Sequence, residues 1–106
     1  MFVILWEFEV KPGSESAFEN AYGAQGDWVR FFRRDPHYHM TYLLKDFSRP
    51  RIYCTMDFWD SEDAYENFKN QQRETYHALD QATVPLTLRE RFIGSFLQSE
   101  TGTPSL

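Results

Sequence analysis

Apolar side chains alternate along the N-terminal segment, residues 2–10, with the period of a β-strand. Every even-numbered residue from Phe2 to Val10 is apolar, and these residues fall on one face of an extended strand because side chains alternate with a period of two. The opposite face is apolar at Val3 and Leu5 and acidic at Glu7 and Glu9. The segment predicts a strand that is covered on one side throughout and on the other side in part.

A helical region follows this strand and is expected to be bent or split. Pro12-Gly13-Ser14 ends the strand, and Ser14 can cap a helix that ends near Gly23. Gly26-Asp27 indicates a break and a second start, after which aromatic residues recur at helical spacing until Asp35-Pro36 stops the run.

The rest of the chain predicts two strands, a long helix and a last strand. Residues 37–45 alternate, with Tyr38, Met40, Tyr42 and Leu44 expected on one face, and residues 51–59 alternate as well. The turn-forming segment 46–50 between them favours a hairpin loop. Ser61 can cap the helix that follows, and Pro85 is its latest end. The last strand is expected over residues 87–97, with a bulge at Gly94.

The predicted order is β-α-(α)-β-β-α-β, which is an α+β fold of the ferredoxin-like kind with a four-stranded antiparallel sheet. We expect one domain over residues 1–97 and a flexible C-terminal tail over residues 98–106, which has almost no apolar content.

The helices of such a fold cover one sheet face and leave the other open. Aromatic residues make up 18% of the chain, more than a small two-layer core easily holds. We therefore expect a homodimer through the open face. That face is predicted to carry Val3, Leu5, Tyr53 and Trp59, or the set of opposite parity.

Composition excludes several classes of partner and compartment. The net charge of −5 gives no basic field for nucleic acid. Cys54 is the only cysteine, so no internal disulfide can form and a reducing compartment fits. The apolar run 2–6 is too short for a signal-peptide core, so we expect a cytoplasmic protein with no membrane partner.

The residues capable of acid-base chemistry leave two hypotheses open for each candidate. His77 can act as a base or lie on a helix surface. Asp57 is a second candidate base, or it pairs with Arg89 or Arg91. No glycine-rich phosphate loop is present, so no nucleotide cofactor is expected.

Two further groups of residues are candidates for binding. His37 and His39 have a spacing that suits a metal, but without an obvious third ligand a surface or interface pair is favoured and no metal site is predicted. Six aromatic residues can line a substrate cavity, or simply form the core: Trp6, Trp28, Phe32, Tyr65, Phe68 and Tyr76.

Several segments together resemble the antibiotic biosynthesis monooxygenase (ABM) domain family. They are Trp6-Glu7-Phe8 before Lys11-Pro12-Gly13, then Gly26-Asp27-Trp28, Phe32-Arg33-Arg34 and the run 58–62, Phe-Trp-Asp-Ser-Glu. The resemblance covers residues 2 to 97. It implies a dimeric α+β barrel with a pocket between each sheet and its helices, and an oxidation by molecular oxygen.

Members of that family include cofactor-independent oxygenases of quinol-like or polyketide aromatics, a heme-degrading branch, and proteins without established activity. The heme branch has an Asn on the first strand, then a Trp and a His nine residues apart on the second helix. These positions fall on Trp6, Phe68 and His77, so only the His is kept and heme degradation ranks below the other activities.

The family register also implies that His77 faces the cavity together with Trp6 and Phe68. Nine residues correspond to two and a half helical turns, so this arrangement requires a break, for which the polar run 70–73 is suited.

Two functions from different classes follow from these features. The first is a cofactor-independent monooxygenase of a small aromatic or quinol-type substrate, in which a base removes a proton and the substrate supplies the electrons. The second is a non-catalytic dimeric module that binds a small apolar ligand or stabilises a partner. Neither requires a bound cofactor.

Overall fold

Four antiparallel strands form one sheet in the order β2-β3-β1-β4. The computed structural model describes residues 1–98. The strands are β1 (Phe2–Val10), β2 (Tyr38–Lys45), β3 (Ile52–Trp59) and β4 (Thr87–Leu97). The helices are α1 (Glu15–Tyr22), α2 (Asp27–Phe32), α3 (Glu62–Gln71) and α4 (Arg73–Thr83), followed by the short 3-10 helix η1 (Val84–Leu86).

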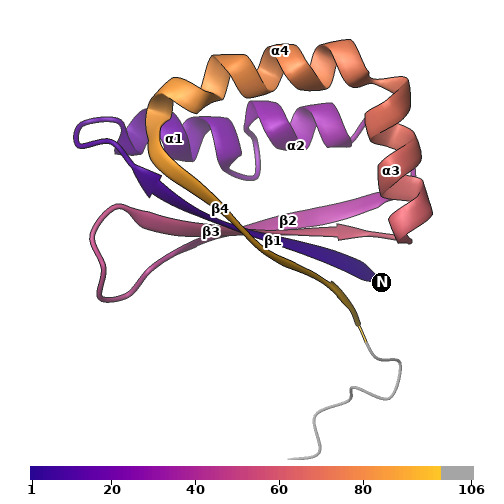
Figure 1. Ribbon diagram of the computed structural model, residues 1–106, viewed down its shortest axis with the longest axis horizontal. Helices are drawn as coiled ribbons and strands as arrows, with labels where there is room; N and C mark the ends of the chain where they lie inside the picture. The colour runs from indigo at the N-terminus through magenta and orange to yellow at the C-terminus, as the bar shows by residue number, and fades with distance from the viewer. Residues whose placement is uncertain (99–106) are drawn as a thin grey trace, which may run out of the picture.

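The helices lie on one side of this sheet. In Figure 1, α1, α2 and α4 form a layer above the sheet, and α3 stands at its end and leads up to α4. Within residues 1–98, no helix covers the opposite face. The ferredoxin-like α+β fold predicted from the sequence is therefore confirmed.

Local signals in the sequence account for most element ends. The first helical region is split into α1 and α2, as predicted. The Ser61 hydroxyl accepts a hydrogen bond from the Ala64 amide at 3.1 Å and caps α3. Ser14 occupies the cap position of α1, but its side chain makes no capping bond. The predicted break in the long helix lies at Gln72, between α3 and α4.

The pairing of β1 with β3 assigns the two faces of the sheet. Phe2 lies opposite Trp59 and Phe8 lies opposite Tyr53, and residues directly opposite in an antiparallel pair share a face. Tyr53 and Trp59 are 1% and 0% exposed beneath the helices. The predicted open-face set was wrong in combining them with Val3, because Val3 pairs with Phe58 on the other side.

Register shifts change the faces of the outer strands, one in β2 and two in β4. In β2 the shift lies between Tyr38 and Met40, so that Tyr38 is buried while Met40 is exposed. In β4 one shift lies where Leu5 pairs with Gly94 and Trp6 pairs with Phe92, which leaves Ile93 as the extra residue, and the other lies where Glu9 pairs with Arg89 and Val10 pairs with Thr87. A bulge was predicted at Gly94, and the structure has it at the neighbouring residue, Ile93.

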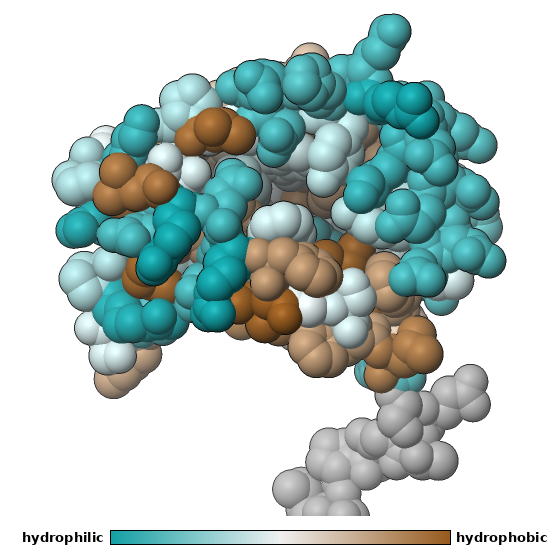
Figure 2. Space-filling view, in the orientation of Figure 1, coloured by the Kyte–Doolittle hydropathy of each residue, from teal (hydrophilic) through white to brown (hydrophobic). Residues whose placement is uncertain are grey.

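The open face has an apolar part and a charged part. Exposed apolar side chains from the two outer strands lie on it: Met40, Tyr42, Leu44 and Phe96. Figure 2 shows hydrophobic side chains gathered along the lower surface, beneath the sheet, whereas the helices above present a hydrophilic surface. Toward the β2–β3 hairpin, the same face carries charged residues instead.

Aromatic side chains fill the layer between sheet and helices. Phe18 stacks on Tyr22 with ring centroids 4.3 Å apart. Phe68 lies 4.8 Å from Phe31 and 5.3 Å from Trp59, again between ring centroids, and is 1% exposed. Such rings contribute both buried area and edge-to-face contacts.

The end of the described chain remains attached to the sheet. The Gln98 amide donates a hydrogen bond to the Met1 carbonyl at 2.8 Å. Residues 99–106, which make up the rest of the predicted tail, lie outside the described residues. No helix within residues 1–98 is both long enough and apolar enough to span a membrane.

The core role of Phe68 gives a stability prediction. Phe68→Ala is expected to lower the free energy of unfolding by about 3–5 kcal/mol, because it removes a ring packed on all sides. Phe47→Ala, at a fully exposed ring in the hairpin loop, is the matched control and should change it by less than about 0.5 kcal/mol. Urea unfolding at one fixed protein concentration measures both; equal effects would contradict the packing described.

Candidate functional site

A cavity of about 270 Å³ lies between the helix-facing side of the sheet and the helices. The register of β1 and β3 explains its position. Large aromatic residues stand at both ends of the central strands, whereas β3 contributes only Thr55 and Asp57 between them. The smaller side chains leave the space, near the lower limit of ordinary ligand pockets.

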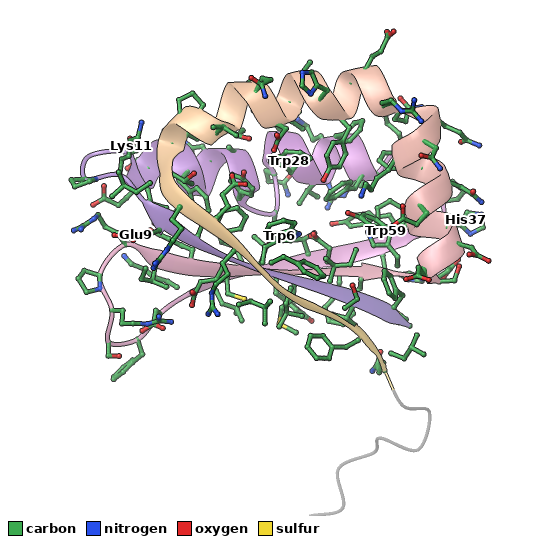
Figure 3. The ribbon with its side chains drawn as sticks, in the orientation of Figure 1. Trp6, Glu9, Lys11, Trp28, His37 and Trp59 are labelled. Carbon is green, nitrogen blue, oxygen red and sulfur yellow. The ribbon has the colours of Figure 1, made fainter. Side chains whose placement is uncertain are left out.

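Five of the six predicted binding aromatics line this cavity: Trp6, Trp28, Phe32, Tyr65 and Tyr76. They come from β1, α2, α3 and α4, so every layer of the fold contributes to the wall. Figure 3 shows Trp6 rising from the sheet and Trp28 lying beneath α4, both in the space between the layers.

Thr83 holds two of the cavity aromatics in place. Its hydroxyl oxygen accepts hydrogen bonds from the Trp28 indole and from the Tyr22 phenol, each at 3.3 Å. The same hydroxyl donates to the Leu79 carbonyl at 3.0 Å. Thr83 is 3% exposed, so this arrangement fixes α2 and α1 against the end of α4.

Asp57 is the buried carboxylate of the cavity. It lies on β3, is 9% exposed and lines the cavity from the sheet side. Burial raises the pKa of Asp57 from 3.8 to about 6, and a hydrogen bond from Thr41 opposes this shift. The alternative pairing with arginine is not observed, because Arg89 pairs with Glu9 and Arg91 pairs with Glu7.

A chain of hydroxyl groups ends at Asp57. The Thr41 hydroxyl donates to Asp57 Oδ1 at 2.6 Å, and the Tyr38 hydroxyl lies 2.7 Å from the same Thr41 oxygen. With Asp57 ionised, Thr41 gives its single proton to the carboxylate, and Tyr38 must therefore donate to Thr41. The bulge at the start of β2 makes this chain, because it turns Tyr38 to the helix side.

Two acidic residues of the cavity were not among the predicted site residues. Asp80 on α4 and Glu90 on β4 both line it. Glu90 Oε1 is buried without a hydrogen-bond partner, and burial, with the charge of Asp80 added, raises the pKa of Glu90. The alternation Arg89-Glu90-Arg91 was the available signal, because it places the glutamate on the face opposite the two arginines.

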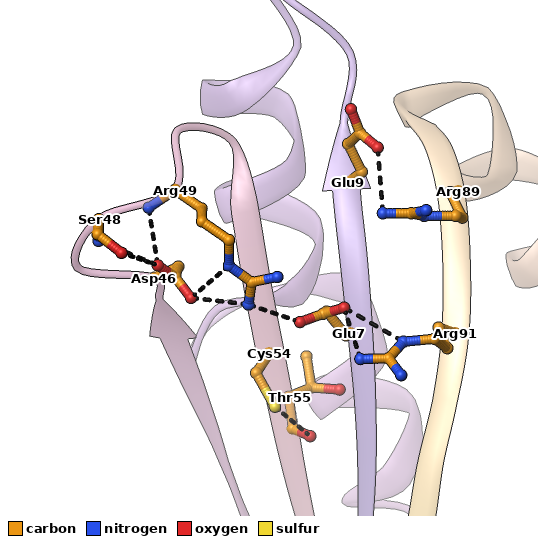
Figure 4. Close-up of polar contacts among 9 residues, drawn as sticks. All are labelled: Glu7, Glu9, Asp46, Ser48, Arg49, Cys54, Thr55, Arg89 and Arg91. Carbon is orange, nitrogen blue, oxygen red and sulfur yellow. Dashed lines mark hydrogen bonds and ion pairs between the residues drawn. The ribbon is translucent and has the colours of Figure 1, made fainter.

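Arg89 and Arg91, the basic residues on either side of Glu90, lie on the opposite face of the sheet. Glu7 accepts hydrogen bonds from Arg49 at 2.8 Å and from Arg91 at 3.1 Å, as Figure 4 shows. These bonds lower the pKa of Glu7. Among the residues that the structure describes, none of those lining the cavity is a lysine, an arginine or a histidine.

The phenols of the cavity are neutral at physiological pH. Burial raises the pKa of Tyr22, Tyr65 and Tyr76 above the ordinary value of 10. They can donate hydrogen bonds but do not add charge.

The positions expected for His77 and Phe68 are wrong. His77 is exposed on α4 and does not line the cavity, although the helix breaks where the prediction required. The buried side of α4 is marked by Tyr76, Leu79 and Thr83, and His77 lies about 100° around the helix from Tyr76. Phe68 lies in the aromatic core outside the cavity.

His37 and His39 lie at the outer end of the sheet. Both imidazoles contact the Asp60 carboxylate, His37 through Nδ1 at 2.9 Å and His39 through Nε2. The contact with Asp60 raises the pKa of His37. Within residues 1–98, no group of three or more suitable side chains is arranged to hold a metal ion. The side chains of His37 and His39 are 57% and 35% exposed, so the pair lies on the surface. Figure 3 shows His37 at the edge of the molecule beside α3.

Solved structures share this fold. A variant of SnoaB, a cofactor-independent oxygenase from Streptomyces nogalater, has a TM-score of 0.78 at 19% identity over 97% of both chains. A variant of MhuD with two manganese protoporphyrin IX groups bound per active site has a TM-score of 0.71 at 17% identity, covering 92% of this chain and 94% of that one. A conserved protein from Methanosarcina mazei has a TM-score of 0.68 at 11% identity over 92% of both chains.

The sequence comparisons give the family. No curated protein matches the chain. The family model described as antibiotic biosynthesis monooxygenase matches residues 1–78, a span that contains β1 to β3, α1 to α3 and the cavity residues Trp6, Trp28 and Asp57. The chain therefore belongs to the antibiotic biosynthesis monooxygenase family.

Proposed function

We propose that this protein is a cofactor-independent monooxygenase of a small aromatic or quinol-type substrate, with Asp57 as its base. The observation that carries the proposal is a buried carboxylate with no cationic partner in an aromatic cavity. Its pKa of about 6 suits a group that must be ionised near neutral pH and still accept a proton.

The reaction requires two things of the protein, a base and a cavity that holds the substrate next to dioxygen. Asp57 removes a proton from the phenol or hydroquinone, and the aromatic walls hold the electron-rich ring against dioxygen. One oxygen atom enters the ring and the other leaves as water. The substrate supplies all the electrons that reduce dioxygen, so a hydroquinone gives a hydroxyquinone and water.

Heme does not fit the residues of this cavity. Protoporphyrin carries two carboxylates, and the cavity lining within residues 1–98 holds three further carboxylates and no cation to meet them. The histidine of the heme-branch register, His77, is exposed outside the cavity.

Replacement of the base is the direct test of activity. Asp57→Asn is expected to lower kcat by about 10²–10⁴-fold in oxygen-electrode assays with a panel of hydroquinones, because the amide cannot accept the proton. Wild-type activity should rise as pH increases through about 6, where the carboxylate ionises. Asp63→Asn, an exposed carboxylate on α3, is the matched control.

Two results would contradict this assignment. If Asp57→Asn retained activity, Asp57 would not be the base. If His77→Ala lost activity, the base would be His77 instead. No oxygen consumption with any member of the panel would favour the non-catalytic ligand-binding alternative.

The same substitution gives a stability prediction with a defined sign. The folded state keeps the Asp57 proton up to about pH 6, whereas the unfolded state releases it near 3.8. Ionised Asp57 therefore destabilises the fold above about pH 6, by up to about 3 kcal/mol, and this penalty is absent below about pH 4.

Asp57→Asn should consequently be more stable than wild type at about pH 8, and the gain should disappear at about pH 4. Glu66→Gln, which changes an exposed carboxylate of α3, should differ from wild type by less than about 0.5 kcal/mol at either pH. Urea unfolding at fixed protein concentration measures both. A gain that is the same at the two pH values would contradict the burial described.

We also propose that the protein is a homodimer formed through the open sheet face. Its apolar part, with Met40, Tyr42, Leu44 and Phe96 each 40–51% exposed, is the kind of contiguous patch that supports an interface.

Light scattering at micromolar concentration is expected to give the mass of two chains. Tyr42→Lys places a charge in this face and should raise the dimer dissociation constant at least about tenfold. Val84→Lys, at an exposed apolar residue of η1 away from the sheet, should leave it unchanged. A monomer mass for wild type would overturn the proposal.

A further inference from the structure

We propose that the cavity selects small aromatic molecules that carry a protonated amine over neutral or anionic molecules of the same shape. The inference names the class of substrate for the cavity used in the proposed function, and it rests on that function only in sharing the site.

The three carboxylates of the cavity come from different elements. Asp57 comes from β3, Asp80 from α4 and Glu90 from β4. The arginines that flank Glu90 in sequence pair with Glu7 and Glu9 on the other side of the sheet. Within residues 1–98, no cationic side chain lines the cavity. An anionic ligand would therefore meet only like charge.

Glu90 gives the second observation. Its Oε1 atom is buried and has no hydrogen-bond partner within the described residues, so the protein itself does little to stabilise the charge of this carboxylate. Asp57 receives one hydrogen bond, from Thr41, and no ion pair. An ammonium group in the cavity carries a positive charge, so it can offset the charge of carboxylates that the protein leaves without a cation.

The aromatic walls favour the same kind of ligand. The faces of tryptophan and tyrosine rings attract cations. Two of the wall rings already do so from outside the cavity, because Lys69 Nζ lies 4.8 Å from the ring centroid of Tyr65 and 5.7 Å from that of Tyr76. Trp6 and Trp28 supply further ring faces inside.

The proposed oxidation gains from a positively charged substrate. When Asp57 takes the proton, negative charge moves onto the substrate ring, close to Asp80 and Glu90. An ammonium group on the same molecule offsets that charge within the cavity. A neutral phenol has no such compensation.

The affinity for an amine should depend on pH. The titratable and charged groups around the three carboxylates are Tyr22, Tyr38, Tyr65, Tyr76 and Lys69. The pKa values of all four phenols are raised, so they stay neutral. Burial raises the pKa of Asp57 to about 6 and also raises the pKa of Glu90, so these two carboxylates gain negative charge as the pH rises from about 5 to about 7.5. Amine binding should strengthen over this range.

Three probes on one scaffold test the inference. Tyramine carries an ammonium group, 4-ethylphenol is neutral and 4-hydroxyphenylacetate is anionic. Anaerobic calorimetric titration of the full-length protein, with quenching of Trp6 and Trp28 fluorescence as a second readout, should give tyramine an affinity about tenfold above that of 4-ethylphenol. 4-Hydroxyphenylacetate should bind most weakly, and the tyramine advantage should shrink at about pH 5.

Matched variants locate the effect. Glu90→Gln keeps the shape of the side chain, and together with Asp80→Asn it should reduce tyramine to the affinity of 4-ethylphenol, while the affinity for 4-ethylphenol changes less than about twofold. Glu9→Gln, on the open face, is the control and should keep the preference. Circular dichroism and thermal unfolding check the fold, and Glu90→Gln alone should show a partial loss.

The outcomes separate this inference from the proposed function. Equal affinities for tyramine and 4-ethylphenol, tightest binding of the anion, or no measurable binding of any probe at millimolar concentration would overturn it. Selective tyramine binding without oxygen consumption by any phenol would support it while the monooxygenase proposal fails. Oxygen consumption with neutral hydroquinones, without any preference for the amine, would support the monooxygenase proposal and overturn the inference about amines.

Discussion

The pairing register of β1 and β3 is the constraint on which the rest of the structure depends. It sets Phe2 against Trp59 and Phe8 against Tyr53, so that bulky rings support the helices at both ends of the sheet. Between these supports, Thr55 and Asp57 are too small to fill the layer, and the cavity lies there. The same pairing therefore builds the core and places a carboxylate inside it, and the raised pKa of Asp57 follows from that burial.

Sequence patterns predicted the elements of this fold well because each pattern reports on local geometry. Alternation gave the first three strands, Ser61 gave the start of α3, and the polar run 70–73 gave the break before α4. Five of the six aromatics proposed for the cavity line it.

The errors in assigning side chains to faces share one cause. Which face a residue occupies depends on how its strand or helix pairs or packs with its neighbours, and the sequence of a single element does not show this. The parity of β3 relative to β1, and of Tyr38 relative to Met40, depends on register and on a bulge that no single strand encodes. His77 was assigned by counting from another family branch, whereas α4 is oriented by its own buried residues Tyr76, Leu79 and Thr83. Asp80 and Glu90 come together only in the folded chain, where α4 and β4 line the same cavity.

The bulge at Ile93 decides which sign of charge the cavity receives. As the strand stands, Glu90 lies opposite Phe8 on the helix side, and Arg91 lies opposite Glu7 on the open side. If Ile93 were paired with Trp6 in a regular ladder, every residue before it would slip by one place, and Arg91 would take the position opposite Phe8. The same amino-acid sequence in β4 would then place a guanidinium group, in place of a carboxylate, in the cavity wall. In this strand, a backbone irregularity therefore sets the charge that β4 presents to the cavity, so a chain with the same residue types and a regular strand would present the opposite charge.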